Sequence, residues 1–172
     1  MHLLYKIKWL YWRYIASPEA YARHLGVNIG HNNLIGKNHW SSEPYLITIG
    51  NNCALTNCRI FTHGGATVAR NKYPNFDFFG KVTIGDYVYI GTNALIMPGV
   101  TLGDNVLVAA GSIVTKSVPS GMVVAGNPAR CIGTVEQFIE RNIKYNLESK
   151  NLSFKEKKEF LLSLSADKFI QK

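Results

Sequence analysis

The chain has 172 residues, of which 47% are hydrophobic, and its 19 Lys and Arg outnumber its 11 Asp and Glu. This apolar content excludes a disordered chain, and the length fits one domain with a sizeable core. No apolar run reaches roughly 18 residues, so the sequence predicts no membrane-spanning helix. The net charge of +8 favours an acidic partner, which could be nucleic acid, an anionic membrane surface or a phosphate-bearing cofactor.

The N-terminal residues 1–25 are expected to form a helical cap. Residues 3–15 have an apolar face and a basic face, which predicts an amphipathic helix rather than a secretory signal. Ser17 as N-cap, Pro18 in the first turn and Gly26 at the end predict a second helix. Covering the end of a repeat domain is the expected role, and peripheral contact of residues 3–15 with an anionic membrane is the alternative.

A six-residue repeat follows. From residue 84 every sixth position is aliphatic, as the series Ile84, Ile90, Ile96, Leu102, Val108 and Val114 shows. The same frame occurs earlier at Ile29, Ile35, Ile49, Leu55 and Phe61, with longer gaps after positions 35 and 61. This period fits neither a helix nor a hairpin meander; it predicts a β-solenoid in which each hexapeptide makes one short strand and one corner. Asn51, Asp86 and Asp104, each after a glycine, are expected at corners that need positive φ.

Residues 64–80 interrupt the repeat and contain several aromatic side chains. A loop of this length inside a repeat fold is usually functional. We expect Tyr73, Phe76 and Phe78 to contact a sugar substrate or a neighbouring subunit. After Arg130 the repeat stops, and the capping-box patterns at Thr134–Gln137 and Ser153–Glu156 predict two helices, to about Leu147 and Leu164.

The cysteines and most histidines carry little signal for chemistry. Cys53, Cys58 and Cys131 show no metal-type spacing and are predicted to be reduced thiols of a cytoplasmic protein. Cys53 falls on a small interior position, which makes an acyl-cysteine intermediate unfavourable. His31 and His39 are placed at early corners without an assigned role, and no bound metal is expected.

The repeat resembles the hexapeptide-repeat acyltransferases, in particular the branch that acetylates galactosides, maltose, polysaccharides and antibiotics. The resemblance covers residues 26–132 and rests on the segments 90–94, 98–103, 111–116 and 126–130. It implies a left-handed parallel β-helix over residues 26–132, in a mainly β protein with the N-terminal helices before it and a C-terminal helical extension, residues 133–172, after it. It also implies a homotrimer with sites between adjacent subunits.

The resemblance places the catalytic base at His63, which precedes the long loop. The repeat frame puts His63 two positions after an inward Phe61 and therefore outside the core. An imidazole, whose ordinary pKa is about 6.5, can accept the proton of a sugar hydroxyl as that hydroxyl attacks a thioester. A polar partner usually orients such an imidazole, and the sequence does not identify one.

The resemblance also indicates where acetyl-CoA would bind. The channel positions implied are Tyr89, Thr92, Ala110, Thr115, Lys116, Pro128 and Arg130. Lys116 and Arg130 are the cations suited to its phosphates.

The sequence thus predicts an acetyl-CoA-dependent O-acetyltransferase acting on a sugar of a bacterial surface polysaccharide or its precursor. An N-acyltransferase acting on an amino sugar, a xenobiotic acetyltransferase and a non-catalytic β-solenoid scaffold remain open alternatives. No nucleic-acid-binding motif is present, and a nucleic-acid partner is not expected.

Overall fold

The computed structural model describes residues 6–7 and 10–171. The chain divides into two compact units, Met1–Val135 and Glu136–Lys172, which are described separately. None of the described helices is long and apolar enough to cross a membrane.

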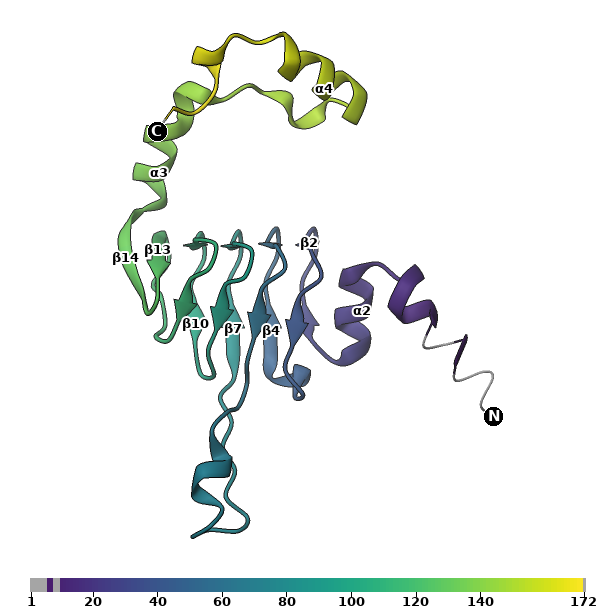
Figure 1. Cartoon of the computed structure of the whole chain (residues 1–172), viewed down its shortest axis with the longest axis vertical. Helices are drawn as coiled ribbons and strands as arrows, with labels where there is room; N and C mark the ends of the chain where they lie inside the picture. The colour runs from purple at the N-terminus through teal and green to yellow at the C-terminus, as the bar shows by residue number, and fades with distance from the viewer. Residues whose placement is uncertain (1–5, 8–9, 172) are drawn as a thin grey trace. The chain divides into compact units, whose positions relative to one another are not determined.

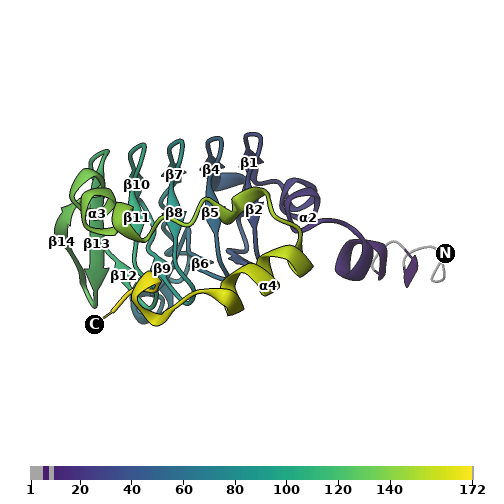
Figure 2. The same cartoon turned by 90° about the horizontal axis from the view of Figure 1, so that it is seen from above.

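The first unit is built from three parallel sheets that the chain visits in turn (Figures 1 and 2). The first contains β1 (Asn28–Ile29), β4 (Ile47–Ile49), β7 (Val82–Ile84) and β10 (Thr101–Leu102). The second contains β2 (Leu34–Ile35), β5 (Ala54–Leu55), β8 (Tyr89–Ile90), β11 (Leu107–Val108) and β13 (Met122–Gly126), and β14 (Ala129–Thr134) adds to it antiparallel to β13. The third contains β3 (His39–Trp40), β6 (Arg59–Ile60), β9 (Leu95–Ile96) and β12 (Ile113–Val114).

The strands pair between successive coils with offsets that differ along the stack. Asn28 pairs with Thr48 and His39 with Arg59, so the first two coils are 20 residues apart. Thr83 pairs with Thr101, which gives the 18-residue spacing of three hexapeptides. Where this 18-residue spacing holds, the six-residue repeat correctly predicts which residue of each strand points inward.

The frame is wrong at the third strand of the second coil, where it places Phe61 inward. The inward residue of β6 is Ile60, which is fully buried, and Phe61 is only half-buried. The reason is that the corner between the second and third sheets is one residue shorter there. Ile35 is followed by a buried Trp40, and Leu55 by Ile60, whereas Ile90 is followed by Ile96. His63 therefore lies three residues after the inward position.

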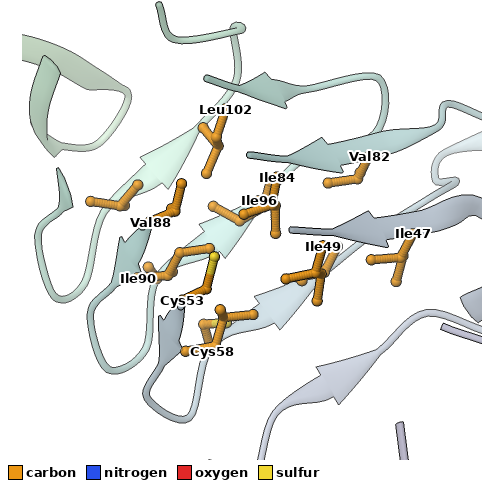
Figure 3. Close-up of a cluster of buried hydrophobic side chains, with 14 of the residues drawn as sticks. Ile47, Ile49, Cys53, Cys58, Val82, Ile84, Val88, Ile90, Ile96 and Leu102 are labelled. Atoms are coloured by element: carbon orange, nitrogen blue, oxygen red, sulfur yellow. The ribbon is translucent and has the colours of Figure 1, made fainter. Parts of the chain in front are cut away.

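The core is a column of aliphatic side chains from successive coils, with Cys53 and Cys58 among them (Figure 3). Both thiols are buried as the sequence predicts for Cys53, and burial raises the pKa of Cys58 to about 12. Neither cysteine is placed to act as a nucleophile, since only the thiolate attacks.

The corners are held by a ladder of polar side chains. The backbone N–H of Asn51 donates to Asp86 Oδ1 at 2.7 Å, and that of Asp86 donates to Asp104 Oδ1 at 2.7 Å. Positive φ occurs one residue later than expected, at Asn52, Tyr87 and Asn105. The expected corner residues therefore act as hydrogen-bond acceptors rather than as left-handed residues.

The helices begin largely where the capping signals lie. α2 (Pro18–Leu25) has Ser17 as N-cap and ends at a left-handed Gly26, as predicted. The predicted helix over residues 3–15 lies partly outside the described residues, and the described part contains a π-helical turn, Tyr11–Ile15. In the second unit, α4 (Phe154–Ser163) opens with the predicted Ser153–Glu156 capping box.

The other predicted C-terminal helix is shorter than expected. α3 (Val135–Asn142) ends before a 3₁₀ turn at Ile143–Tyr145, so the extension to Leu147 is wrong.

Substitutions at neighbouring positions of one strand should change the free energy of unfolding by very different amounts, because only one of the two side chains lies in the aliphatic column. Ile84→Ala should lower the free energy of unfolding by about 2–5 kcal/mol, because Ile84 is 1% exposed and its removal leaves a cavity. Thr83→Ala, on the exposed side of the same strand, should change it by less than about 0.5 kcal/mol. Denaturant unfolding of both variants measures this contrast, and equal losses would contradict the inward assignment.

Candidate functional site

His63 lies at the corner that follows the third sheet, beside a carboxylate that the sequence did not reveal. His63 Nδ1 is 2.6 Å from Glu43 Oε2. The pairing follows from the 20-residue offset between the first two coils, since His39 and Arg59 are register partners and Glu43 and His63 each lie four residues further on. Extending the offset of Ile29 and Ile49 to position 63 would have identified Glu43.

The carboxylate of Glu43 is fixed by neighbouring hydroxyl groups. Thr62, which is fully buried, donates its hydroxyl to Glu43 Oε2 at 2.9 Å. Ser41 Oγ lies 3.4 Å from the same oxygen and accepts the backbone N–H of Thr62 at 3.2 Å. These contacts hold the carboxylate on one side of the imidazole.

The charge of Glu43 is favoured by its surroundings. Partial burial raises the pKa of this carboxyl, but hydrogen bonds from Thr62, His63 and Ser42, together with the charge of His63, outweigh that effect. The pKa of Glu43 therefore lies below its ordinary value, and the group is a carboxylate at neutral pH. Because a carboxylate only accepts hydrogen bonds, His63 Nδ1 carries the proton, and Nε2 is left as a proton acceptor.

The imidazole is accessible to a substrate. The His63 side chain is 38% exposed, whereas that of Glu43 is 18% exposed. This arrangement has the geometry of a general base with a partly buried orienting acid, and it can take a proton from a hydroxyl or amine placed at Nε2.

The arm formed by residues 64–80 starts directly at His63. His63 forms an isolated antiparallel bridge with Phe79, and their rings are 6.0 Å apart in an edge-on arrangement. The sequence did not single out Phe79 as a contact of His63. The backbone N–H of Gly80 donates to Thr62 O at 2.7 Å and closes the arm.

The predicted substrate residues lie further out on the arm, which extends away from the strands in Figure 1. The ring of Phe76 lies 6.5 Å from that of Tyr73 and 5.7 Å from that of Phe78. All three side chains are exposed. The structure thus groups them with each other and brings Phe79, rather than any of them, to His63.

Two of the predicted cofactor residues meet in one pocket. Lys116 and Arg130 line a hollow of about 400 Å³, whose other lining residues are Val114, Ser117, Val118, Pro119, Met122, Val124, Ala129 and Cys131. The lining of this pocket is partly apolar and carries two cations, which fits a ligand with both a hydrocarbon portion and phosphates. Neither cation forms an ion pair in the described part of the chain.

This pocket lies along the same corner as His63. The backbone N–H of Phe61 donates to Ile96 O, and that of Met97 donates to Val114 O, so these corners are stacked. Two coils separate His63 from Lys116, a rise of about 10 Å at the usual strand spacing.

The remaining predicted cofactor residues do not line this pocket. Tyr89 points outward from β8 and is 43% exposed. Thr92 and Ala110 lie on stacked corners between the second and third sheets. These corners are closely packed, since a Cβ on Gly91 would lie 2.5 Å from the backbone nitrogen of Ala110. Thr115 precedes Lys116 on an exposed corner, and Pro128 follows a cis peptide bond in the β13–β14 turn.

Residues 81–116 match the bacterial transferase hexapeptide (six repeats) family. Protein CapG of Staphylococcus aureus is 42% identical over 150 residues, an alignment that covers 84% of this chain and 87% of CapG. The chain belongs to the hexapeptide-repeat acetyltransferase family. It is an acyltransferase.

Other comparisons agree with this membership. The galactoside O-acetyltransferase of Escherichia coli (strain K12) is 34% identical over 120 residues, covering 69% of this chain and 59% of that protein. A solved galactoside acetyltransferase in complex with coenzyme A is 25% identical, with a TM-score of 0.57 and coverage of 80% of this chain and 82% of that one. Among the described residues there is no group of three or more His, Cys, Asp or Glu side chains that could hold a metal ion.

The contact between Glu43 and His63 should determine which ring nitrogen of neutral His63 carries the proton. In the wild-type protein near neutral pH, neutral His63 should be mainly the Nδ1–H tautomer. In Glu43→Gln the amide can accept or donate, so both tautomers should be populated. ¹⁵N chemical shifts of the His63 imidazole measure this. Glu19→Gln, a change in α2, is the matched control, and an unchanged tautomer in Glu43→Gln would contradict the positioning role.

Proposed function

We propose that this acyltransferase moves an acetyl group from acetyl-CoA to a hydroxyl of a sugar in a bacterial surface polysaccharide or its precursor. The observation that carries the proposal is the 2.6 Å contact between Glu43 and an accessible His63. The similarity to a galactoside O-acetyltransferase supports a sugar hydroxyl as the acceptor.

In the proposed mechanism, both substrates are bound together and His63 is the general base. Acetyl-CoA supplies a thioester whose carbonyl carbon is attacked and whose thiolate leaves. His63 Nε2 takes the proton from the acceptor hydroxyl as its oxygen bonds to that carbon, and the imidazolium then returns the proton to the leaving sulfur. Glu43 holds the imidazole in the required tautomer and stabilises its positive charge.

The pocket around Lys116 and Arg130 is the proposed site for the phosphates of coenzyme A. Its position two coils from His63 leaves room for an extended chain that ends at the imidazole. Tyr89, Thr92, Ala110, Thr115 and Pro128 remain proposed channel residues. Thr115 and Pro128 adjoin the Lys116 pocket in sequence and would extend it. Tyr89, Thr92 and Ala110 lie on another face and another corner of the stack, so they would complete the channel of an adjacent subunit.

A left-handed winding and a homotrimer are part of the same proposal. The outward residues of the first sheet are Asn28, Thr48, Thr83 and Thr101, all polar. The second sheet instead exposes Leu34, at 70%, and Tyr89. This difference between faces supports packing of the second sheet against another subunit. The division at residues 25 and 132, the cytoplasmic location and the membrane contact of residues 3–15 stay predictions.

Removing the base tests the mechanism directly. His63→Ala should lower the rate of acetyl transfer at least about 100-fold, the typical contribution of general base catalysis, while leaving the Kd for coenzyme A nearly unchanged. Thiol release from acetyl-CoA, assayed over a panel of hydroxyl and amino sugars, measures the rate and identifies the acceptor class. His31→Ala, at a different corner, is the matched control. Full activity in His63→Ala would overturn the mechanism.

Removing the cations tests the donor site. Lys116→Ala/Arg130→Ala should weaken coenzyme A binding on the order of 100-fold, because two charge-assisted contacts to phosphate are lost. Lys155→Ala/Lys158→Ala removes the same charge from α4 and should bind as the wild type does. Calorimetry on the three proteins gives the Kd values. An unchanged Kd in the first variant would place the phosphates elsewhere.

A further inference from the structure

A second cationic pocket, distinct from the one around Lys116, lies at the corner between the second and third sheets. It has a volume of about 290 Å³ and is lined by Lys37, Asn38, His39, Asn57, Cys58, Arg59 and Asn93. We refer to it as the Lys37 pocket. Its lining consists of basic side chains, three asparagines and a buried thiol, and it contains no acidic residue.

The Lys37 pocket exists because of the shortened corners of the first two coils. Five residues, rather than six, separate the inward positions Ile35 and Trp40, and the same is true of Leu55 and Ile60. Less backbone therefore fills this edge than in the third coil, where Asn93 stands at the full-length corner.

The shape of the pocket is fixed by hydrogen bonds within the corners. Asn38 Oδ1 accepts the backbone N–H of Cys58 at 2.8 Å, and Asn38 Nδ2 donates to Leu55 O at 3.2 Å. The backbone N–H of Asn93 donates to Asn57 O at 3.1 Å. These bonds occupy Asn38, whereas the side-chain amides of Asn57 and Asn93 have no hydrogen bond in the described residues.

The charge in this pocket is unbalanced. His39 and Arg59 are register partners on adjacent strands, so their outward side chains lie side by side. Lys37 is two residues from His39. Neither Lys37 nor Arg59 forms an ion pair within the described part of the chain. Cations gathered without a counter-charge are stabilised by an anionic ligand.

The position of the pocket relates it to the acceptor rather than to the donor. Arg59 precedes His63 by four residues, so their Cα atoms are at most about 14 Å apart. Phe61 lies between them, half-buried, with its ring 5.9 Å from that of His39. The Lys116 pocket is reached from His63 in a different direction, across the coils. An anionic group in the Lys37 pocket would therefore not be a phosphate held by Lys116 and Arg130 of the same subunit.

We propose that the Lys37 pocket binds an anionic group of the acceptor glycan, several bonds away from the hydroxyl that is acetylated. This inference rests on the proposed function for the identity of the acceptor. The shared chemistry is a carboxylate or phosphate carried by a sugar. Arg59 and Lys37 contact the anion, the Asn57 and Asn93 amides donate to it, and the Phe61 ring packs against the sugar that leads to His63.

The test compares binding of charged and neutral sugars to the whole protein, with trigalacturonate, galactotriose and glucose 6-phosphate as probes. Wild-type protein should bind at least one of the two anionic probes at least about tenfold more tightly than galactotriose, and this preference should shrink at high salt. In Lys37→Ala/Arg59→Ala the preference should disappear. Calorimetry in the presence of saturating coenzyme A measures each Kd.

The matched control is Lys116→Ala/Arg130→Ala, which loses the same charge from the other pocket. Measured beside the wild type, both without coenzyme A, it should keep the anion preference. Trigalacturonate binding identifies a carboxylate as the anion, and glucose 6-phosphate binding identifies a phosphate. Equal Kd values for charged and neutral probes, no binding of either anion at millimolar concentration, or an unchanged preference in Lys37→Ala/Arg59→Ala would overturn the proposal. Preference without acetyl transfer would contradict the proposed function alone, and acetyl transfer without preference would contradict the pocket alone.

Discussion

The register between coils is the constraint on which the rest of this structure depends. It is set by the buried aliphatic residue of each short strand, which stacks on its counterpart above and below, as the sticks in Figure 3 show. Strands of two or three residues form too few hydrogen bonds to align themselves. Burial of one side chain per strand is what aligns them, and the corner ladder through Asn51, Asp86 and Asp104 then ties the coils together. Every distance in the site, including that between Glu43 and His63, is a consequence of this register.

The sequence revealed the regular part of the fold and missed the irregular part. A period of six is visible from Ile84 to Val114 because each hexapeptide there forms one short strand with one inward aliphatic residue, followed by one corner. The first two coils break that period by a shortened corner and an insertion. Phe61 fits the six-residue frame and was therefore predicted to point inward, although Ile60 is the residue that fills the core. Periodicity cannot separate two adjacent apolar residues when the corner length is unknown.

The site was predictable to a similar degree. The resemblance to the acyltransferase family pointed to His63 before the long arm, and to Lys116 and Arg130, as candidate site residues. Glu43 could not be identified from local sequence, since it lies 20 residues away on another coil and is brought to His63 only by register. Phe79 was missed for a related reason. The two ends of the arm pair with each other, so the residue nearest His63 comes from the far end of the insertion.

Both insertions that lengthen a coil occur at the same corner, after the third sheet, whereas the shortened corners lie between the second and third sheets. The segment that contains Glu43 and the arm of residues 64–80 open there, while the corner after the first sheet keeps its length and its ladder. Exchange of either segment would leave the aliphatic column untouched. The fold thus separates the residues that determine stability from those of the proposed site, and one edge of the molecule can change in sequence and length without affecting the core. New acceptor preferences could arise along this edge by insertion and deletion, without a compensating change in the core.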